Sequence, residues 1–214
     1  MPAIWDAIIK GGAAGLILAM LIGGPVFVAL IRISINKGFL TGLFFALGVV
    51  ISDSSFFVLS FLGISQLKDS NLVHEILGFG GGAFLIVFGI SMIFKKEKPI
   101  TVTNGIMQGS RIKSMVSGFL INTLNPSAFI FWIATVSTVS AQFSGKNNLV
   151  LWFFIGCVSM VFGTDVLKAF LAGKVKDLVT PKFMLWLHRV SGTILLIIGA
   201  QTLTVAVLKY VHSH

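Results

Sequence analysis

The feature that most constrains this chain is an apolar run from Phe39 to Ile64 with one acidic residue, Asp53, near its middle. The run exceeds the about 20 residues that a helix needs to cross a bilayer, so it predicts a membrane-spanning helix. An ionised carboxylate at that depth costs ~2.5–3.5 kcal/mol on insertion scales, and such residues usually face a bundle interior or a water-filled cavity. Because Ser52, Ser54 and Ser55 flank Asp53, this part of the helix is polar enough to line an interior site.

Composition supports a membrane protein. The chain has 214 residues, of which 56% are hydrophobic and only 11% are charged, whereas about a quarter of a soluble domain is charged. The net charge of +9 is therefore a signal of membrane topology, and we expect no nucleic-acid partner. The single cysteine, Cys157, excludes an intrachain disulfide and a paired-cysteine redox motif.

Six apolar segments predict an all-α membrane protein with six transmembrane helices in one domain, residues 1–214. The segments are residues 7–31, 39–64, 72–94, 114–139, 148–172 and 187–208, and residues 32–37, 65–71, 95–113, 140–147 and 173–186 are expected to be the five loops between them. The first, third and fifth loops hold most of the basic residues: Arg32, Lys37, Lys95, Lys96, Lys98, Arg111, Lys113, Lys174, Lys176 and Lys182. Because Lys and Arg collect on the cytoplasmic side, this bias predicts that both termini lie outside the cytoplasm.

The two halves of the chain resemble one another. Repeat one is residues 7–94, the cytoplasmic loop is residues 95–113, and repeat two is residues 114–208. The segments GAFLIVFG and GTILLIIG, residues 82–89 and 192–199, occupy the third span of each half. Since three spans are an odd number, the second repeat must be inverted in the membrane. Inverted repeats whose helices are broken at corresponding places are a transporter design, and the breaks point to the substrate site.

Pro25 and Pro126 predict breaks in helices 1 and 4. A proline inside a helix removes a backbone hydrogen bond, and in lipid the freed carbonyl must be satisfied by protein or water. Gly24 precedes Pro25, and Asn122 and Asn125 precede Pro126. An unwound turn with these amides would suit the ammonium and carboxylate groups of an amino acid. The alternative is a tolerated kink with no binding role.

Asp53 and Asp165 are the candidates for proton coupling, because a carboxylate in a span can take up and release a proton or pair with a substrate amine. Asp165 has a second interpretation, since Lys168 follows three residues later and the two can pair on one helix face. Asp53 has no basic residue within one helical turn. The chain lacks a nucleophile elbow, a zinc helix motif and a phosphate loop, so we expect no enzyme, no metal and no cofactor.

Several stretches resemble the LysE/RhtB-type amino-acid exporters. The first half reads GGPVFVALIRISINKGFLTGLFFALGVVISDSSFFVLSFLGI, and the second half contains INTLNPSAFIFWIA and HRVSGTILLIIG. The Gly-Pro of the first span, the Asp of the second span and the Asn-Pro of the fourth span carry the resemblance. The chain is similar to these exporters over nearly its whole length. The resemblance implies roles for Gly24, Pro25, Asp53, Asn125 and Pro126.

The resemblance implies a multi-pass protein of the bacterial inner membrane that exports amino acids or related small solutes with the proton gradient. The expected partners are that solute and membrane lipids, and the glycine-rich helix faces also allow a homodimer. Two alternatives stay open. One is a divalent metal-ion exporter that uses Asp53 and Asp165, and the other is a membrane scaffold that transports nothing.

Overall fold

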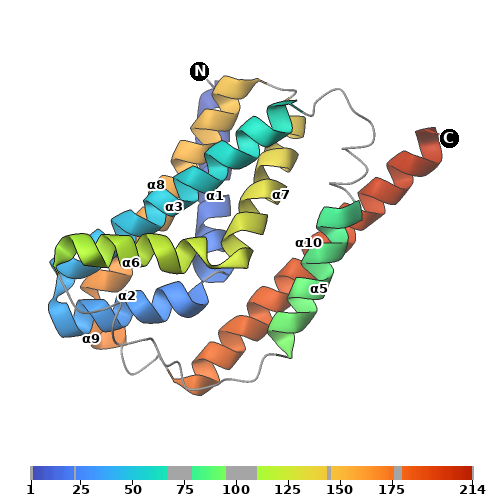
Figure 1. Ribbon diagram of the computed structural model, residues 1–214. Helices are drawn as coiled ribbons and strands as arrows, with labels where there is room; N and C mark the ends of the chain where they lie inside the picture. The colour runs from blue at the N-terminus through green and yellow to red at the C-terminus, as the bar shows by residue number, and fades with distance from the viewer. Residues whose placement is uncertain are drawn as a thin grey trace.

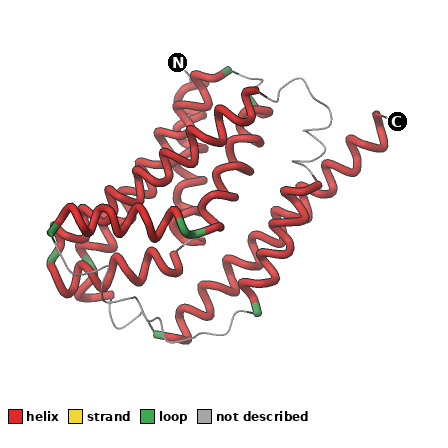
Figure 2. The backbone as a smooth tube through the Cα atoms, viewed as in Figure 1, coloured by secondary structure: helices red, strands yellow, loops and turns green. Residues whose placement is uncertain are grey.

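The computed structural model describes residues 2–21, 23–66, 79–94, 110–143, 146–175 and 180–213. This part of the chain is helical and contains no strand (Figure 2). Its helices are α1 (Pro2–Leu21), α2 (Gly23–Lys37), α3 (Phe39–Gln66), α5 (Gly81–Ile93), α6 (Arg111–Thr123), α7 (Pro126–Gln142), α8 (Asn147–Phe170), α9 (Ala172–Val175) and α10 (Pro181–Ser213). The prediction of an all-α protein is therefore confirmed for the described residues.

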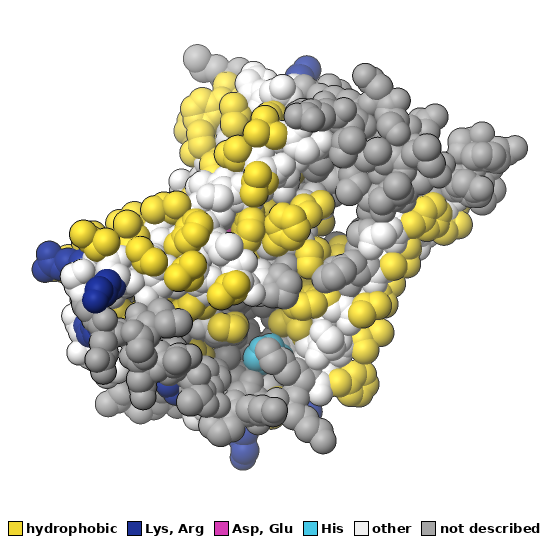
Figure 3. All heavy atoms as spheres, in the orientation of Figure 1, with side chains coloured by type: hydrophobic (Ala, Val, Ile, Leu, Met, Phe, Trp, Pro, Cys, Tyr) yellow, Lys and Arg dark blue, Asp and Glu magenta, His cyan; other side chains and the backbone are white. Residues whose placement is uncertain are grey.

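Three of the described helices are long and apolar enough to cross a membrane: Pro2–Ala19, Phe39–Gly63 and Asn147–Phe170. A fourth crossing is reached if Arg111–Thr123 and Ala128–Ser140, which meet at a bend of 67°, count as one span. Hydrophobic side chains cover much of the face seen in Figure 3, and Lys and Arg lie at its margins. The chain is a multi-pass membrane protein, whereas six spans in two inverted repeats stay a prediction.

Helix α2 extends further than the sequence suggested, so the expected loop at residues 32–37 is wrong. Ile33 and Ser34 are buried, and Ser34 donates a hydrogen bond to the Leu30 carbonyl at 2.8 Å, so burial keeps this segment helical despite Arg32 and Lys37. Only Gly38 separates α2 from α3, with a φ of 83° that a side chain would strain. The first loop is therefore a one-residue turn.

The expected loop at residues 173–186 is also too long. Helix α9 spans Ala172–Val175, and α10 already begins at Pro181. The Thr180 hydroxyl accepts a hydrogen bond from the Phe183 backbone N–H at 3.2 Å, which is the contact of an N-cap residue. Proline is favoured at the first helical position that follows such a cap. Residues 72–78 of the third predicted span lie outside the described residues.

Glycines allow three pairs of helices to approach closely, as is usual between membrane helices. A Cβ atom on Gly11 or Gly15 of α1 would collide with the α8 backbone, and one on Gly48 of α3 would collide with the α6 backbone at Met115. In the third pair, α5 and α10 lie side by side (Figure 1). There Gly82 faces Gly199, and Gly89 faces Gly192.

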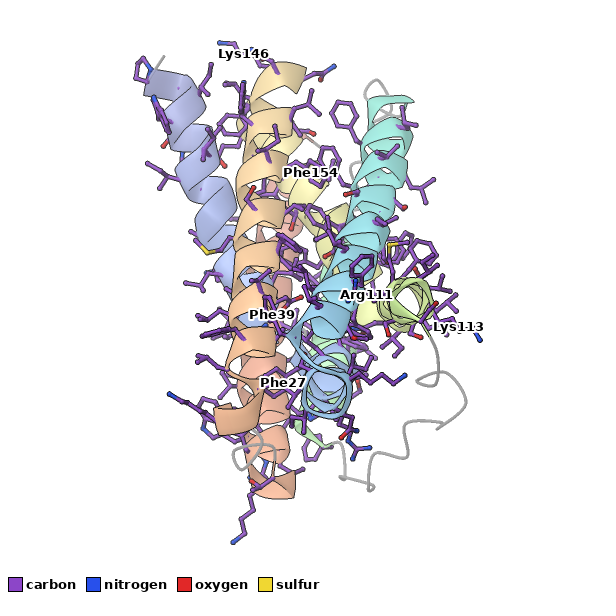
Figure 4. All side chains as sticks on the ribbon, turned by 90° about the vertical axis from the view of Figure 1, so that its left-hand side faces the viewer. Phe27, Phe39, Arg111, Lys113, Lys146 and Phe154 are labelled. Atoms are coloured by element: carbon purple, nitrogen blue, oxygen red, sulfur yellow. The ribbon has the colours of Figure 1, made fainter. Side chains whose placement is uncertain are left out.

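Two groups of buried apolar side chains meet along α3. Val49 belongs to a group shared with α2 and α8, and Phe56 and Phe57 belong to a group shared with α1, α7 and α8. Figure 4 shows α3 beside α8, with Lys146 at the upper end of α8 and Phe39 lower down on α3. Asp53 lies on α3 between the two apolar groups, so the fold places this carboxylate among packed helices.

Candidate functional site

Asp53 is the centre of the candidate site. Its side chain is 3% exposed, and its Oδ1 accepts hydrogen bonds from Asn122 Nδ2 at 2.9 Å and from the indole Nε1 of Trp132 at 3.0 Å. Asn122 lies near the end of α6 and Trp132 lies in the second turn of α7. One carboxylate oxygen of α3 therefore contacts both helices that flank the bend at residues 124–125.

The backbone of this bend keeps its hydrogen bonds. The Asn125 N–H donates to the Asn122 carbonyl at 3.0 Å, and the Ala128 N–H donates to the Asn125 carbonyl at 3.1 Å. Beside Asp53, the hydroxyls of Ser52 and Thr123 are 2.9 Å apart and share a hydrogen bond. Two adjacent residues of α3 thus bind two adjacent residues at the end of α6.

Aromatic rings enclose Trp132, which is fully buried. The ring centroids of Phe57 and Phe154 lie 5.9 Å and 5.5 Å from that of Trp132, both in edge-on orientation. Phe57 and Phe154 stack on each other at 4.0 Å. This packing fixes the indole plane, so the N–H is held in position to donate to Asp53.

Asp165 and Lys168 form an ion pair on α8, with Oδ1 and Nζ 2.9 Å apart, which agrees with the second of the two interpretations of Asp165. The Lys168 ammonium also donates to the Ala19 carbonyl at 3.2 Å and lies 5.9 Å from the centroid of the Phe27 ring. Ala19 is in the last turn of α1, where helix carbonyls lack partners within the helix. The ammonium satisfies one of them and also suits the negative end of the helix dipole.

A small cavity of about 30 Å³ joins these groups. Asp53, Asn122, Asp165 and Lys168 supply its polar wall, and its apolar wall is formed by Leu18, Ala19, Val26, Phe27, Val49 and Val161. Pockets that hold small ligands have volumes of about 300–1,000 Å³. The cavity is therefore too small for a ligand of this kind, which could bind only if the helices moved apart.

The other predicted site residues lie close in the sequence to residues that line this cavity. Gly24 and Pro25 belong to the first turn of α2, directly before Val26 and Phe27, and Pro126 is the first residue of α7. Pro25 is exposed and Asn125 is half-buried. Within the described residues, the structure brings together Asp53, Asn122 and Asp165, while Pro25 and Asn125 do not line the cavity.

Sequence reasoning missed two residues. Trp132 lies in the apolar run after Pro126 and was given no role of its own, although a buried indole N–H usually has an acceptor. Lys168 was considered only as a partner for Asp165, whereas it also lines the cavity. A basic residue inside an apolar span is itself a signal of an interior site, because its charge is costly in lipid. In the part of the chain that the structure describes, no three His, Cys, Asp or Glu side chains gather as metal ligands would.

Comparisons with known proteins identify a family and two similar proteins. The profile of the LysE type translocators matches residues 16–205. The chain is 27% identical over 178 residues to the Bacillus subtilis protein named "Putative amino acid efflux protein YcgF", covering 82% of this chain and 85% of that protein. It is also 27% identical over 204 residues to "Uncharacterized membrane protein slr1627" of Synechocystis sp., covering 91% and 94% of the two chains. No solved structure matches it. Since the profile spans most of the chain, this protein belongs to the LysE type translocator family.

Proposed function

We propose that this protein exports an amino acid or a related small solute across the bacterial inner membrane, and that it catalyses no chemical reaction. The family is one of translocators, and a relative that aligns with most of the chain is named for amino acid efflux. The observation that carries the proposal is Asp53, which is buried in an apolar helix and lines a cavity with Asn122, Asp165 and Lys168.

The solute site of this proposal is centred on the cavity. Asp53 binds the solute amine, and Asn122 supplies a hydrogen bond. Gly24, Pro25, Asn125 and Pro126 contribute backbone groups from the adjacent turns once the cavity opens. Support comes from the position of Gly24 and Pro25 directly before Val26 and Phe27, which line the cavity, and of Asn125 and Pro126 shortly after Asn122, which lines it as well.

The architecture of this proposal is a single domain of two inverted three-helix repeats, with helices 1 and 4 broken near Pro25 and Pro126. Two observations support it. The glycines of α5 and α10 meet reciprocally, Gly82 with Gly199 and Gly89 with Gly192, as a two-fold relation requires. The close pairs α1–α8 and α6–α3 are then equivalent, because each joins the first helix of one repeat to the second span of the other.

The hydrogen bonds of Asp53 support the coupling to protons in this proposal. As a carboxylate, its Oδ1 accepts from α6 and from α7, and bonds to a charged acceptor are stronger than bonds to a neutral one. Protonation weakens both bonds at once and so loosens the bend between the two helices. In this proposal the solute amine and the proton compete for Asp53, and Asp165 is the second candidate for a proton.

The test is solute efflux from proteoliposomes loaded with labelled amino acids, for the wild type and for Asp53→Asn. We expect wild-type efflux of a subset of amino acids, accelerated by an inward proton gradient, and an inserted Asp53→Asn protein that exports at background rate. Asp6→Asn is the matched control, because Asp6 is an exposed aspartate of α1 paired with Lys10 at 2.8 Å, and it should export normally.

Three outcomes would contradict the proposal. The first is an Asp53→Asn protein that inserts normally and exports at the full rate. The second is efflux of divalent metal ions instead of amino acids, with loss in Asp53→Asn and in Asp165→Asn, which would establish the metal-ion exporter. A protein that moves no solute of either kind, and tolerates substitution at Asp53 and Pro126, would be a scaffold.

A further inference from the structure

Lys168 places a positive charge at the cavity. The proposed export function assigns this charge no role. An ammonium group has three N–H donors. Two of them are engaged, by Asp165 Oδ1 at 2.9 Å and by the Ala19 carbonyl at 3.2 Å. Within the described residues, the third donor has no hydrogen-bond acceptor, and the same side chain lines the cavity. Lys168 can therefore accept a ligand without giving up either contact.

Asp53, which also lines this cavity, can accept a hydrogen bond from a ligand. Both of its hydrogen bonds, from Asn122 and from Trp132, arrive at Oδ1. In the described part of the chain no hydrogen bond reaches Oδ2, and both donors to Oδ1 are neutral groups. A single small cavity thus holds one cation with a spare donor and one carboxylate with a spare acceptor.

We propose that Lys168 is the residue that binds the carboxylate of the exported amino acid, at the opposite end from the amine bound by Asp53. This inference rests on the proposed export function and adds the residue that makes the site select for a free carboxylate. The apolar walls contributed by Leu18, Val49 and Val161 suit the remainder of such a solute. A simple amine would leave the Lys168 ammonium without its new partner, and a simple acid would leave Asp53 without one.

Asp165 has a distinct role in this scheme. It is 7% exposed in its side chain and holds the Lys168 ammonium while the cavity is empty. The Phe27 ring, 5.9 Å from Nζ, adds a cation–π contact on the α2 side. Because Asp165 already neutralises part of the Lys168 charge at 2.9 Å, it weakens the attraction of the ammonium for a solute carboxylate without having to leave it. Removing its charge should strengthen the preference for a carboxylate, while removing the charge of Lys168 should abolish that preference.

The test compares each common amino acid with its own carboxamide, which keeps the amine and the side chain but lacks the negative charge. Apparent affinities are measured for the purified full chain from the rise in melting temperature with ligand concentration. For the wild type we expect every stabilising amino acid to bind about tenfold or more tightly than its carboxamide, since a hydrogen bond to a charged group is lost.

Four variants separate binding from structure. Lys168→Gln should bind acid and amide about equally, and Asp165→Asn should keep or widen the wild-type preference. Because Lys168→Gln leaves the Asp165 charge unpaired in the interior, the double variant Asp165→Asn with Lys168→Gln repeats the test with two neutral groups. Lys146→Gln is the matched control, since this exposed lysine precedes α8 at its other end, and it should behave as the wild type.

The inference is overturned if the wild type binds an amino acid and its carboxamide equally. It is also overturned if Asp165→Asn loses the preference for an amino acid over its carboxamide as completely as Lys168→Gln does. The ion pair would then act only by holding the helices in position. Absence of stabilisation by every amino acid and every carboxamide, together with absence of efflux, would refute the proposed export function and this inference with it. Stabilisation and efflux without discrimination would refute the role of Lys168 alone.

Discussion

At the scale of single residues, the contact between Trp132 and Asp53 makes the sharpest prediction. Trp132→Phe keeps most of the ring packing against Phe57 and Phe154 but removes the N–H that donates to Asp53 Oδ1 at 3.0 Å. A hydrogen bond to a charged group contributes about 1.5–3 kcal/mol. We expect a lower melting temperature, and slower efflux because Asp53 loses the donor that orients it. Melting curves and proteoliposome efflux measure the two effects.

A control for this substitution is Trp152→Phe on α8. Trp152 is 37% exposed, so the same chemical change there should alter the melting temperature and the efflux rate little. If both variants lower efflux equally while their melting temperatures match the wild type, the hydrogen bond to Asp53 does not orient the site.

The residues of the site could be predicted to different degrees. Asp53 was evident because a lone carboxylate in a long apolar run has few structural explanations. Asn122 was found through its place before Pro126, although its partner was not. Trp132 could not be paired with Asp53 from the sequence, because the contact depends on how α7 packs against α3. Contacts of this kind depend on the tertiary structure and cannot be predicted from the spacing of residues in the sequence.

At the scale of helices, the glycines of α3 give a prediction about packing. A Cβ atom at Gly48 would collide with the Met115 backbone of α6, whereas one at Gly63 would meet nothing within 4 Å. Gly48→Ala must push α3 and α6 apart, and we expect it to lower the free energy of unfolding by about 1–3 kcal/mol. Gly63→Ala should leave stability unchanged or raise it, because alanine favours a helix by about 1 kcal/mol.

Thermal melts of the two variants in the same detergent make this comparison. Equal melting temperatures for Gly48→Ala and Gly63→Ala would mean that α3 and α6 do not pack as closely as described. The pair is well matched, since both glycines lie in α3 and both changes add a single methyl group.

Helix positions were predicted better than helix ends. The second and fifth apolar segments agree with α3 and α8 within a few residues, because long apolar runs have no other place in a membrane protein. The segment at residues 32–37 was assigned to a loop on account of its charges. The structure keeps it helical because Ile33 and Ser34 are buried, and burial by neighbouring helices is not visible in a charge pattern.

At the scale of the whole molecule, the orientation in the membrane is the open prediction. The basic loops place Lys113 on the cytoplasmic side and Lys146 outside. Both lysines are exposed, so Lys113→Cys and Lys146→Cys should each accept a maleimide. In intact cells an impermeant maleimide should label Lys146→Cys alone, and opening the membrane should expose Lys113→Cys. The native Cys157 is buried and should contribute little background. The reverse pattern of labelling would invert the predicted topology.

The two hydrogen bonds that meet at Asp53 Oδ1 also have a consequence for how mutations combine. Because Asn122 and Trp132 both hold the Asp53 carboxylate in one orientation, each should bind it more weakly once the other has gone and Asp53 is free to turn. A double-mutant cycle on Asn122→Ala and Trp132→Phe should therefore show a coupling energy of about 0.5–3 kcal/mol, as for residues in one network. Strict additivity would mean that α6 and α7 sense Asp53 separately. Coupling would mean that α6 and α7 behave as one thermodynamic unit, although each packs more extensively against α3 than against the other.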